Sequence, residues 1–394
     1  MKQKKPKKWI KTRHKIVQFI FRTPFYLFWK RKYNAKIEKF DFKGKNYIVL
    51  YNHQTPADQF FLNKMFYKKD YFLGTEDIMS NGFISKLLKF GFAPIPIDKT
   101  GNDFNAVKNC IKVVKEGGTI LIAPEGNRTY SGHTEDFKPS IIKLIRLCKI
   151  PVVLVKIEGG YGVEPRWSNY VRKGEMKIGV SRIIEPLEYA EMDDKTFFGI
   201  IKEGISVDDT KLNQKFTGDK KAEYLERAVC VCPDCGFSEL KSEGNFITCQ
   251  KCGRKVEYKD DLTLSPVEGQ FPFNTVSDWL DYQNDFIKNS YDKNSGAIFT
   301  DKIRLFSVQL YKNKKVLSKN AISYLFFDKI MLSYNGVKEI LSFNDVKQTA
   351  VLGRNKLNVS INGKTYQFKG DMRFNALKYH LFFNNYSTKA EVKL

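Results

Sequence analysis

The sequence contains a histidine and an aspartate at a spacing that suits acid–base chemistry. His53 and Asp58 come just after the apolar run 47–51, which predicts a buried strand. Thr55 is a candidate helix N-cap and Pro56 a candidate first helical residue, so the turn should hold Asp58 near His53. A carboxylate at the far nitrogen of an imidazole makes the histidine a general base. The alternative is a capping-box-like arrangement, in which Asp58 only caps the helix.

A second polar group follows another apolar run. Glu125, Gly126 and Arg128 come directly after residues 118–123, which also predict a strand. In open α/β sheets the loops beyond the carboxyl ends of the strands build the active site, so this loop is expected beside the His53 turn. The arginine guanidinium is a rigid fork that suits phosphate oxygens. The alternative is a surface turn with an internal Glu–Arg ion pair.

A third segment is rich in proline and ends in a cation. Pro94 and Pro96 make residues 92–97 stiff and extended, and Asp98 and Lys99 follow them. This pattern predicts a stiff segment that holds a cation at its end. The alternative is an edge strand that ends in an exposed lysine.

In this order, the segments resemble the glycerolipid acyltransferase superfamily, in particular the 1-acylglycerol-3-phosphate acyltransferases. The family has N-H-x4-D, a block ending in Ile-Asp-Arg, the block Glu-Gly-Thr-Arg and an apolar Val-Pro run. The matching segments are Asn52, His53 and Asp58, Ile97-Asp98-Lys99, Glu125-Gly126-Asn127-Arg128 and Ile150-Pro151-Val152-Val153. The resemblance covers roughly residues 40–200, and it departs from the family pattern at Lys99 and Asn127.

The resemblance implies a catalytic role for His53 and Asp58 and a substrate-binding role for a second set of residues. That set is Glu125, Gly126, Arg128, Lys99 and Asn52. It implies acyl-CoA or acyl-carrier protein as the donor and a lysophospholipid as the acceptor, with 1-acylglycerol-3-phosphate first among the candidates and phosphatidic acid as its product. The reaction needs no redox cofactor.

Four cysteines form two pairs with metal-ligand spacing. Cys232 pairs with Cys235 and Cys249 with Cys252, and a glycine follows each pair. Four thiolates on two tight turns can complete a tetrahedral zinc site, and this pattern resembles a zinc ribbon. No open coordination position is implied, so the zinc is expected to be structural. The alternatives are two disulfides or a redox pair, and Cys230 could compete with Cys232.

The N-terminal segment is basic and aromatic. Residues 1–33 hold twelve Lys and Arg and no Asp or Glu, which is half of the net charge of +24. The aromatic-rich run 16–29 is too short to span a bilayer, and Arg22 and Pro24 interrupt it. Such a segment is typical of a helix that lies in the interface of an anionic membrane. The alternative is a basic tail followed by a helix packed on the protein's own core.

Charge and cysteine usage lead to expectations about location and partners. C-x-x-C pairs in a chain without a recognisable export signal indicate a reducing compartment, so we expect peripheral attachment to the cytoplasmic face of the cell membrane. The basic charge together with a zinc ribbon also fits a nucleic-acid-binding protein. That alternative leaves His53, Glu125 and Arg128 unexplained, so no nucleic-acid partner is expected. A catalytically silent lipid-binding protein of the same fold is the second alternative.

The chain is predicted to contain several folded parts. Alternating strands and helices over residues 34–218 indicate an α/β acyltransferase domain. A zinc ribbon is expected at 219–256, a linker and a helix at 257–296, and a small β-barrel-like domain at 297–394. Roughly seven strands closed by one helix would make this last domain similar to a pleckstrin-homology domain.

Two dipeptides support hairpins in the C-terminal domain. Asn335-Gly336 and Asn362-Gly363 each lie between alternating apolar runs, which is a strong signal for a two-residue hairpin turn. Helices are predicted over 275–289 and 373–383.

Overall fold

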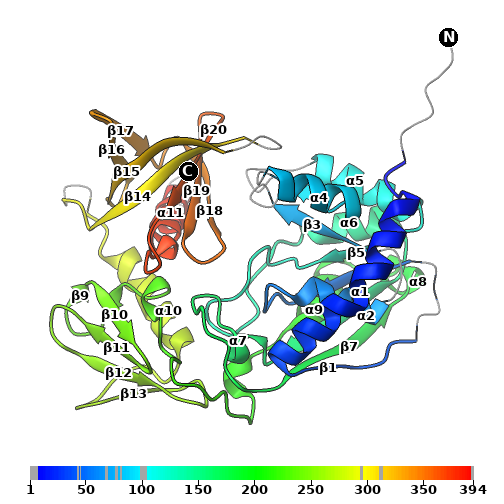
Figure 1. Ribbon diagram of the computed structural model, residues 1–394, viewed down its shortest axis with the longest axis horizontal. Helices are drawn as coiled ribbons and strands as arrows, with labels where there is room; N and C mark the ends of the chain where they lie inside the picture. Colours follow the sequence, from blue (N-terminus) through cyan, green and yellow to red (C-terminus); the bar gives the residue numbers. More distant parts are fainter. Residues whose placement is uncertain are drawn as a thin grey trace. The chain divides into compact units, whose positions relative to one another are not determined.

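The two apolar runs predicted as strands, together with the apolar Val-Pro run that begins at Ile150, are neighbours in one sheet of the computed structural model. Figure 1 shows the ribbon of this model. β2 (Ile48–Tyr51) lies between β5 (Thr119–Ile122) and β6 (Val152–Glu158) and is parallel to both. Every residue of β2 and β5 is buried, as expected for uninterrupted apolar strands in a sheet that is covered on both faces. The predicted strands are confirmed.

The structure describes most of the chain, and its contacts divide it into two units. The described residues are 8–41, 44, 46–66, 70–75, 79, 82–97, 104–292, 296–309 and 314–391. The first unit holds the described residues up to Val163 together with Lys173–Leu212. The second holds Glu164–Arg172 and the described residues from Asn213 onward. Lys99 lies outside the described residues.

The sheet of the first unit has seven strands in the order β1-β7-β6-β2-β5-β3-β4. Its other strands are β1 (Ala35–Ile37), β3 (Asp70–Thr75), β4 (Ile95–Ile97) and β7 (Met176–Ile184). Neighbouring strands are parallel except for the antiparallel pair β6–β7. The α/β class predicted for this part of the chain is confirmed.

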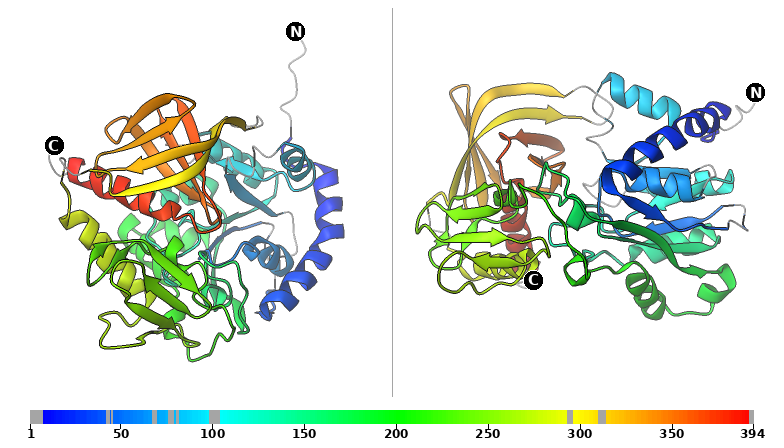
Figure 2. Two further views of the ribbon diagram at one scale, coloured as in Figure 1. Left: turned by 60° about the vertical axis from the view of Figure 1, so that its left-hand side comes forward. Right: turned by 60° about the horizontal axis from the view of Figure 1, so that its bottom comes forward.

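Helices cover the sheet of the first unit (Figure 2). One buried cluster joins residues of β2, β5 and β6 to α5 (Phe104–Lys115), α6 (Ser140–Cys148) and α9 (Asp194–Ile205). The remaining elements are α1 (Thr12–Tyr33), α2 (Asp58–Phe66), α4 (Phe83–Gly91), α7 (Gly160–Val163), α8 (Pro186–Ala190) and η1 (Asp209–Lys211). The alternation of strands and helices expected for this part of the chain is confirmed.

Helix α1 buries polar side chains along the first half of its inner face. His14, Gln18 and Arg22 are each at most 8% exposed. The Gln18 amide donates to the carbonyl of Asp70 over 2.9 Å, and the Arg22 Nε donates to the Asn63 Oδ1 over 3.0 Å. These bonds compensate for the removal of the Gln18 and Arg22 side chains from water.

The second half of α1 packs on α2 through aromatic rings. The ring of Phe25 lies 5.1 Å from that of Phe60, and the ring of Trp29 lies 6.2 Å from it. The aromatic run of this segment is thus divided between the protein core and the exposed surface, a split that its composition does not predict. None of the described helices is long and apolar enough to cross a membrane.

The second unit begins with two small sheets around the cysteine pairs. β8 (Val231–Cys232) pairs with β9 (Gly236–Phe237), and η2 (Leu225–Arg227) precedes them. β10 (Leu240–Glu243), β11 (Phe246–Cys249), β12 (Lys255–Tyr258) and β13 (Leu264–Pro266) form an antiparallel sheet. β13 falls in the stretch that was expected to be a linker. The predicted helix follows as α10 (Val276–Asn289), with Thr275 as its N-cap.

The C-terminal part is an antiparallel sheet of seven strands followed by a helix. The strands are β14 (Phe299–Val308), β15 (Lys315–Leu325), β16 (Lys329–Tyr334), β17 (Val337–Ser342), β18 (Val346–Leu352), β19 (Lys356–Ile361) and β20 (Lys364–Lys369). Both predicted hairpins are confirmed, since β16 pairs with β17 and β19 with β20. The helix, α11 (Ala376–Glu391), extends beyond the predicted end. Among the described residues no pairing joins the edge strands β17 and β18, so the sheet is a half-barrel.

A cluster of aromatic rings joins these parts into one unit. The ring of Phe237 lies 5.0 Å from that of Phe286 in α10, 5.9 Å from that of Phe299 in β14 and 5.6 Å from that of Phe382 in α11. The cysteine-bearing turns and the half-barrel therefore share a hydrophobic core.

The segment Glu164–Arg172 is anchored inside the second unit. Trp167 is fully buried, and its carbonyl accepts a hydrogen bond from the Arg227 guanidinium over 2.7 Å. Glu164 and Arg354 form an ion pair at 2.7 Å. These buried polar contacts tie the connection between β6 and β7 to residues far along the chain.

Candidate functional site

The turn after β2 brings His53 and Asp58 together. The His53 Nδ1 lies 2.8 Å from the Asp58 Oδ2. The Asp58 side chain is fully buried, whereas the His53 side chain is 24% exposed and can reach a substrate. No protein group within the described residues bonds the Nε2 of His53. A proton on Nδ1, donated to Asp58, leaves the Nε2 lone pair facing outward, which is the tautomer that a general base requires.

Asp58 also organises the turn that carries His53. Its carboxylate accepts backbone N–H groups from Gln54 over 2.8 Å and from Thr55 over 3.0 Å, and it accepts the Thr55 hydroxyl over 2.6 Å. The two interpretations of the His53–Asp58 spacing are therefore compatible, because one carboxylate shapes the turn and contacts the imidazole. The helix begins at Asp58 itself.

Glu125 contacts the same turn from the neighbouring strand. Its Oε1 accepts the backbone N–H of His53 over 2.7 Å, and its Oε2 accepts the backbone N–H of Glu135 over 2.7 Å. Burial raises the pKa of Glu125 to about 8, although these two N–H groups oppose the rise. With each oxygen bonded to the backbone, the geometry supports a positioning role for Glu125 in place of the expected contact with substrate.

Asn52 has a comparable role on the other side of β2. Its Nδ2 donates to the carbonyl of Ile157 over 2.8 Å, and its Oδ1 accepts the N–H of Ile157 over 2.7 Å. The side chain is fully buried. This amide joins the His53 turn to β6, and the substrate contact expected for Asn52 stays a prediction.

Gly126 and Arg128 lie in the loop after β5. Gly126 is exposed and has a φ of +71°, a left-handed conformation that strongly favours glycine. Arg128 is partly buried, and the next residue, Thr129, donates its N–H to the carbonyl of His53 over 3.3 Å. The loop that carries Arg128 is thus bonded directly to the His53 turn, as the adjacency of β2 and β5 predicts.

Two nearby residues were not identified from the sequence. The ring of Tyr51 lies 6.2 Å from the His53 ring in an edge-on arrangement, and burial raises the pKa of Tyr51 well above its usual range. Gly160 lies against the turn so closely that an added Cβ would be 2.6 Å from the Cβ of Gln54. The only available signals were the end of an apolar strand and the pair Gly159-Gly160 after β6, and neither is specific.

The four cysteines of the paired knuckles meet at one point in the second unit. The sulfur atoms of Cys232, Cys235, Cys249 and Cys252 all lie within 4.8 Å of one another. The sulfur atoms of Cys232 and Cys252 are 3.6 Å apart and those of Cys235 and Cys249 are 3.5 Å apart, too long for a disulfide bond of about 2.05 Å, and all four cysteines are free. A tetrahedral site with Zn–S distances of about 2.3 Å requires separations of about 3.8 Å, so these four residues fit a zinc ion.

The remaining cysteines lie away from this cluster. Cys230 is buried, its N–H donates to the side-chain oxygen of Gln283, and burial raises the pKa of its thiol to about 12. It does not belong to the group of four, which resolves the competition with Cys232 in favour of Cys232. Cys110 and Cys148 lie in α5 and α6.

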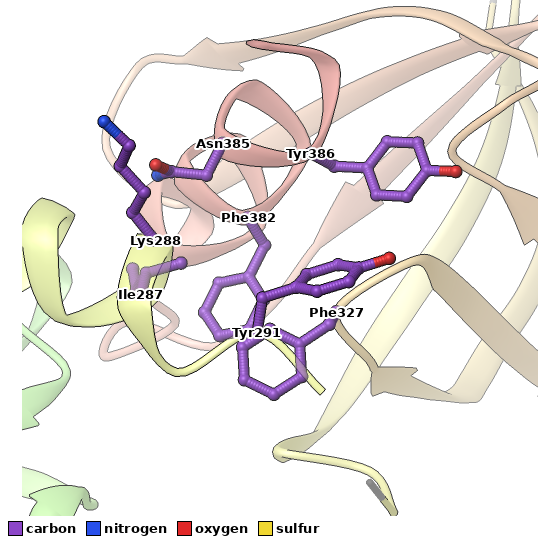
Figure 3. A pocket seen from close by; sticks show the side chains of 7 residues that line it. All are labelled: Ile287, Lys288, Tyr291, Phe327, Phe382, Asn385 and Tyr386. Carbon is purple, nitrogen blue, oxygen red and sulfur yellow. The ribbon is translucent and has the colours of Figure 1, made fainter. Parts of the chain in front are cut away.

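A small pocket in the second unit holds none of the predicted site residues (Figure 3). It lies where α10 and α11 approach the turn between β15 and β16. Its lining residues are Ile287, Lys288, Tyr291, Phe327, Phe382, Asn385 and Tyr386. Of these side chains, Phe382 belongs to the aromatic cluster around Phe237, and the ring of Phe327 lies 5.9 Å from that of Phe237.

We expect Glu125→Gln to lower kcat without changing the apparent KM for the acceptor. The glutamine would turn its amide N–H₂ toward the backbone N–H of either His53 or Glu135, so one of these two hydrogen bonds would be lost. This loss should cost about 1–3 kcal/mol, or roughly 5- to 100-fold in rate. Steady-state kinetics with Asp136→Asn, an exposed carboxylate, as the control would measure it. A selective rise in acceptor KM would instead identify Glu125 as a substrate ligand.

The same variant should change the dependence of stability on pH. The folded chain keeps a proton on Glu125 up to a pKa of about 8, whereas the unfolded chain loses it near 4.5, so this group makes wild-type stability fall as pH rises across that interval. This component should be absent from the melting temperatures of Glu125→Gln.

Comparisons with known proteins agree with this geometry. Residues 31–158 match the family model described as Acyltransferase. The chain is similar to the 1-acyl-sn-glycerol-3-phosphate acyltransferase of Bacillus subtilis (strain 168), with 23% identity over 138 residues, 34% of this chain and 65% of that protein. It thus spans just under two thirds of the length of this curated relative.

Among solved structures, the chain is similar to the crystal structure of the 1-acyl-sn-glycerophosphate (LPA) acyltransferase PlsC from Thermotoga maritima. The TM-score is 0.39 and the identity 18%, over 49% of this chain and 78% of that chain. The family model covers the His53 turn and the Glu125 loop. Residues 31–158 are therefore similar to acyltransferase domains, and the matched residues include the His53 turn.

Proposed function

We propose that this chain transfers a fatty acyl group from acyl-CoA or acyl-carrier protein to the free hydroxyl of a lysophospholipid. The first candidate acceptor is 1-acylglycerol-3-phosphate, which would give phosphatidic acid. The observation that carries the proposal is the 2.8 Å contact between His53 and Asp58 at the end of β2, bonded to the loop that carries Arg128. The domain match and the name of the curated relative support the same reaction class.

In the proposed mechanism His53 acts as the general base. Its Nε2 takes the proton of the acceptor hydroxyl while the oxygen attacks the thioester carbonyl carbon. The carbon–sulfur bond breaks, an ester forms, and the thiolate leaves and recovers a proton from the imidazolium. Asp58 holds the Nδ1 proton and stabilises the positive charge that forms on the ring.

We infer a structural zinc ion at Cys232, Cys235, Cys249 and Cys252, in a zinc-ribbon arrangement. The separation of the sulfur atoms supports it, and thiolate ligands make such an ion a stabiliser of the fold. The half-barrel with α11 behind it supports a pleckstrin-homology-like domain. The basic charge and exposed apolar residues of α1 support peripheral attachment to anionic lipids on the cytoplasmic face of the membrane.

A panel of lysophospholipids tests the proposed reaction. The full-length protein is incubated in detergent micelles with each lysolipid and with labelled acyl-CoA or acyl-carrier protein, and the lipids are separated. Label in a diacyl product that depends on His53 would support the proposal. Labelled free fatty acid alone, or no product with any acceptor, would contradict it.

We expect Arg128→Ala to raise the apparent KM for a phosphate-bearing acceptor by about 10-fold or more. The guanidinium can bind phosphate oxygens through two parallel hydrogen bonds, and such charge-assisted bonds are worth about 1.5–3 kcal/mol each. The donor KM should change little. Arg128→Lys keeps the charge but not the fork, so it should recover only part of the affinity. A selective loss of donor affinity would assign Arg128 to the donor site.

A further inference from the structure

Helix α1 presents large apolar side chains to solvent on the face opposite its packed residues. Ile16 is 54% exposed, Phe19 is 68% exposed and Leu27 is 56% exposed, whereas His14 and Gln18 on the inner face are buried. In the first half of α1 this is the reverse of the usual order for a helix on a water-soluble surface, where the apolar stripe faces the core. The exposed face therefore suits an apolar medium and not water.

Helix α4 also exposes apolar side chains, although about fifty residues of sequence separate it from α1. Phe83, Leu87 and Phe90 are 77%, 59% and 52% exposed. Their spacing of four and three residues places them on one face of the helix. The polar Ser85 is buried on the other side. Two neighbouring helices with this inversion are difficult to explain as isolated surface residues.

The two helices that carry these exposed apolar side chains are in direct contact. The Arg13 side chain of α1 donates to the carbonyl of Phe90 over 3.1 Å, and its guanidinium lies 4.4 Å above the Phe90 ring. An added Cβ at Gly91 would be 2.7 Å from the side chain of Val17, so the helices are packed closely at this point. The exposed apolar residue Phe90 of α4 therefore lies next to the beginning of α1.

Cations surround this surface. Lys86 and Lys89 are exposed on α4, between the exposed apolar residues of that helix. Among the described residues, α1 carries the exposed cations Lys15, Lys30, Arg31 and Lys32 and no acidic residue. Bulky apolar side chains interleaved with cations match the chemistry of a membrane interface, with acyl chains beneath anionic phosphoryl groups.

We propose that α4 and the outward face of α1 form a single lipid-contact surface, so that membrane attachment extends beyond residues 1–33 into the acyltransferase domain. This inference rests on the proposed action on a lysophospholipid at a membrane surface. The occupant is the interface of an anionic bilayer, into which Phe83, Leu87 and Phe90 insert. The contact would hold the catalytic domain against the lipid layer that supplies its acceptor.

Paired substitutions on full-length protein test the surface. Phe83→Ser with Leu87→Ser removes two exposed apolar side chains of α4, and Val337→Ser with Ile340→Ser removes two from β17 as the matched control, where they are 51% and 60% exposed. Binding to vesicles of mixed phosphatidylcholine and anionic phospholipid is measured by sedimentation, and thermal melting checks the fold. The α4 variant should bind at least about 10-fold more weakly than wild type, since burial of one such side chain is worth about a factor of 10. The control should bind as wild type does.

Activity separates this inference from the proposed reaction. With acyl-CoA and lysolipid in detergent micelles, the α4 variant should keep wild-type activity while losing vesicle binding. Equal vesicle binding by the α4 variant and wild type would overturn the inference but leave the reaction standing. Absence of product from wild type in micelles would refute the reaction. A defect confined to acyl-carrier protein as donor, with vesicle binding unchanged, would assign the surface to that acidic protein and overturn the lipid contact.

Discussion

His53→Ala should lower the rate of acyl transfer by about 10²–10⁴-fold, the range that general-base catalysis contributes. The imidazole supplies the only proton acceptor that the proposed mechanism uses, and its Nε2 is open to substrate while Nδ1 contacts Asp58. The measurement is kcat/KM in detergent micelles with labelled acyl-CoA. Because the His53 side chain is partly exposed, thermal melting of the variant should stay close to that of wild type. A folded variant that keeps most of its turnover would disprove the mechanism.

Asp58→Asn separates the two roles of the aspartate. The asparagine is isosteric but uncharged, so it no longer stabilises an imidazolium and can favour the wrong tautomer. We expect a loss of kcat together with a lower melting temperature, because the turn also depends on this carboxylate. A drop in melting temperature with kcat retained would reduce Asp58 to a helix cap.

Purified protein should contain about one zinc ion per chain, and its removal should strongly destabilise the second unit. Binding of structural zinc to zinc-finger peptides is worth about 10–16 kcal/mol near pH 7, which exceeds the stability of most domains. A zinc ion bound by the four sulfur atoms would hold together the turns that carry them. These turns share a hydrophobic core with the half-barrel through the ring of Phe237. Elemental analysis gives the stoichiometry, and hydrogen exchange with and without a strong chelator locates the loosened segments.

Two cysteine-to-alanine variants provide the matched comparison. Cys235→Ala removes a ligand, so zinc content and melting temperature should both fall. Cys230→Ala removes a buried thiol of the same unit that lies outside the cluster, so the variant should retain its zinc. Equal zinc content in the two variants, or zinc-free wild-type protein prepared without chelator, would reject the site.

The sequence predicts local features of this protein better than their combination. Uninterrupted apolar runs identify β2, β5 and β6, because strands buried on both faces need no polar alternation. The Asn-Gly dipeptides identify two hairpins because their turns need φ above zero, as Asn335 and Asn362 show. The position of His53 near Asp58 follows from a short-range turn, which sequence spacing can specify.

The roles of Asn52 and Glu125 depend on contacts that the spacing of residues cannot specify. Asn52 is bonded to Ile157, and Glu125 to the backbone of His53, in each case across neighbouring strands. Strand order is a long-range property, so a motif indicates that a residue belongs to the site but not whether it contacts the substrate or the backbone. The orientation of α1 is also not predictable in this way, because its composition does not show which of its side chains face the core and which face solvent.

The burial of Glu164–Arg172 in the second unit has a consequence for biosynthesis. The chain passes between the units at Val163–Glu164, Arg172–Lys173 and Leu212–Asn213. The second unit is therefore not formed by the C-terminal part of the chain alone, because it also includes Glu164–Arg172. On the ribosome, Trp167 emerges well before its partner Arg227, and much earlier than Arg354, the partner of Glu164. Until Arg227 and Arg354 have been synthesised, the segment Glu164–Arg172 therefore lacks these two partners. A gene truncated after residue 212 would leave the segment in this state permanently.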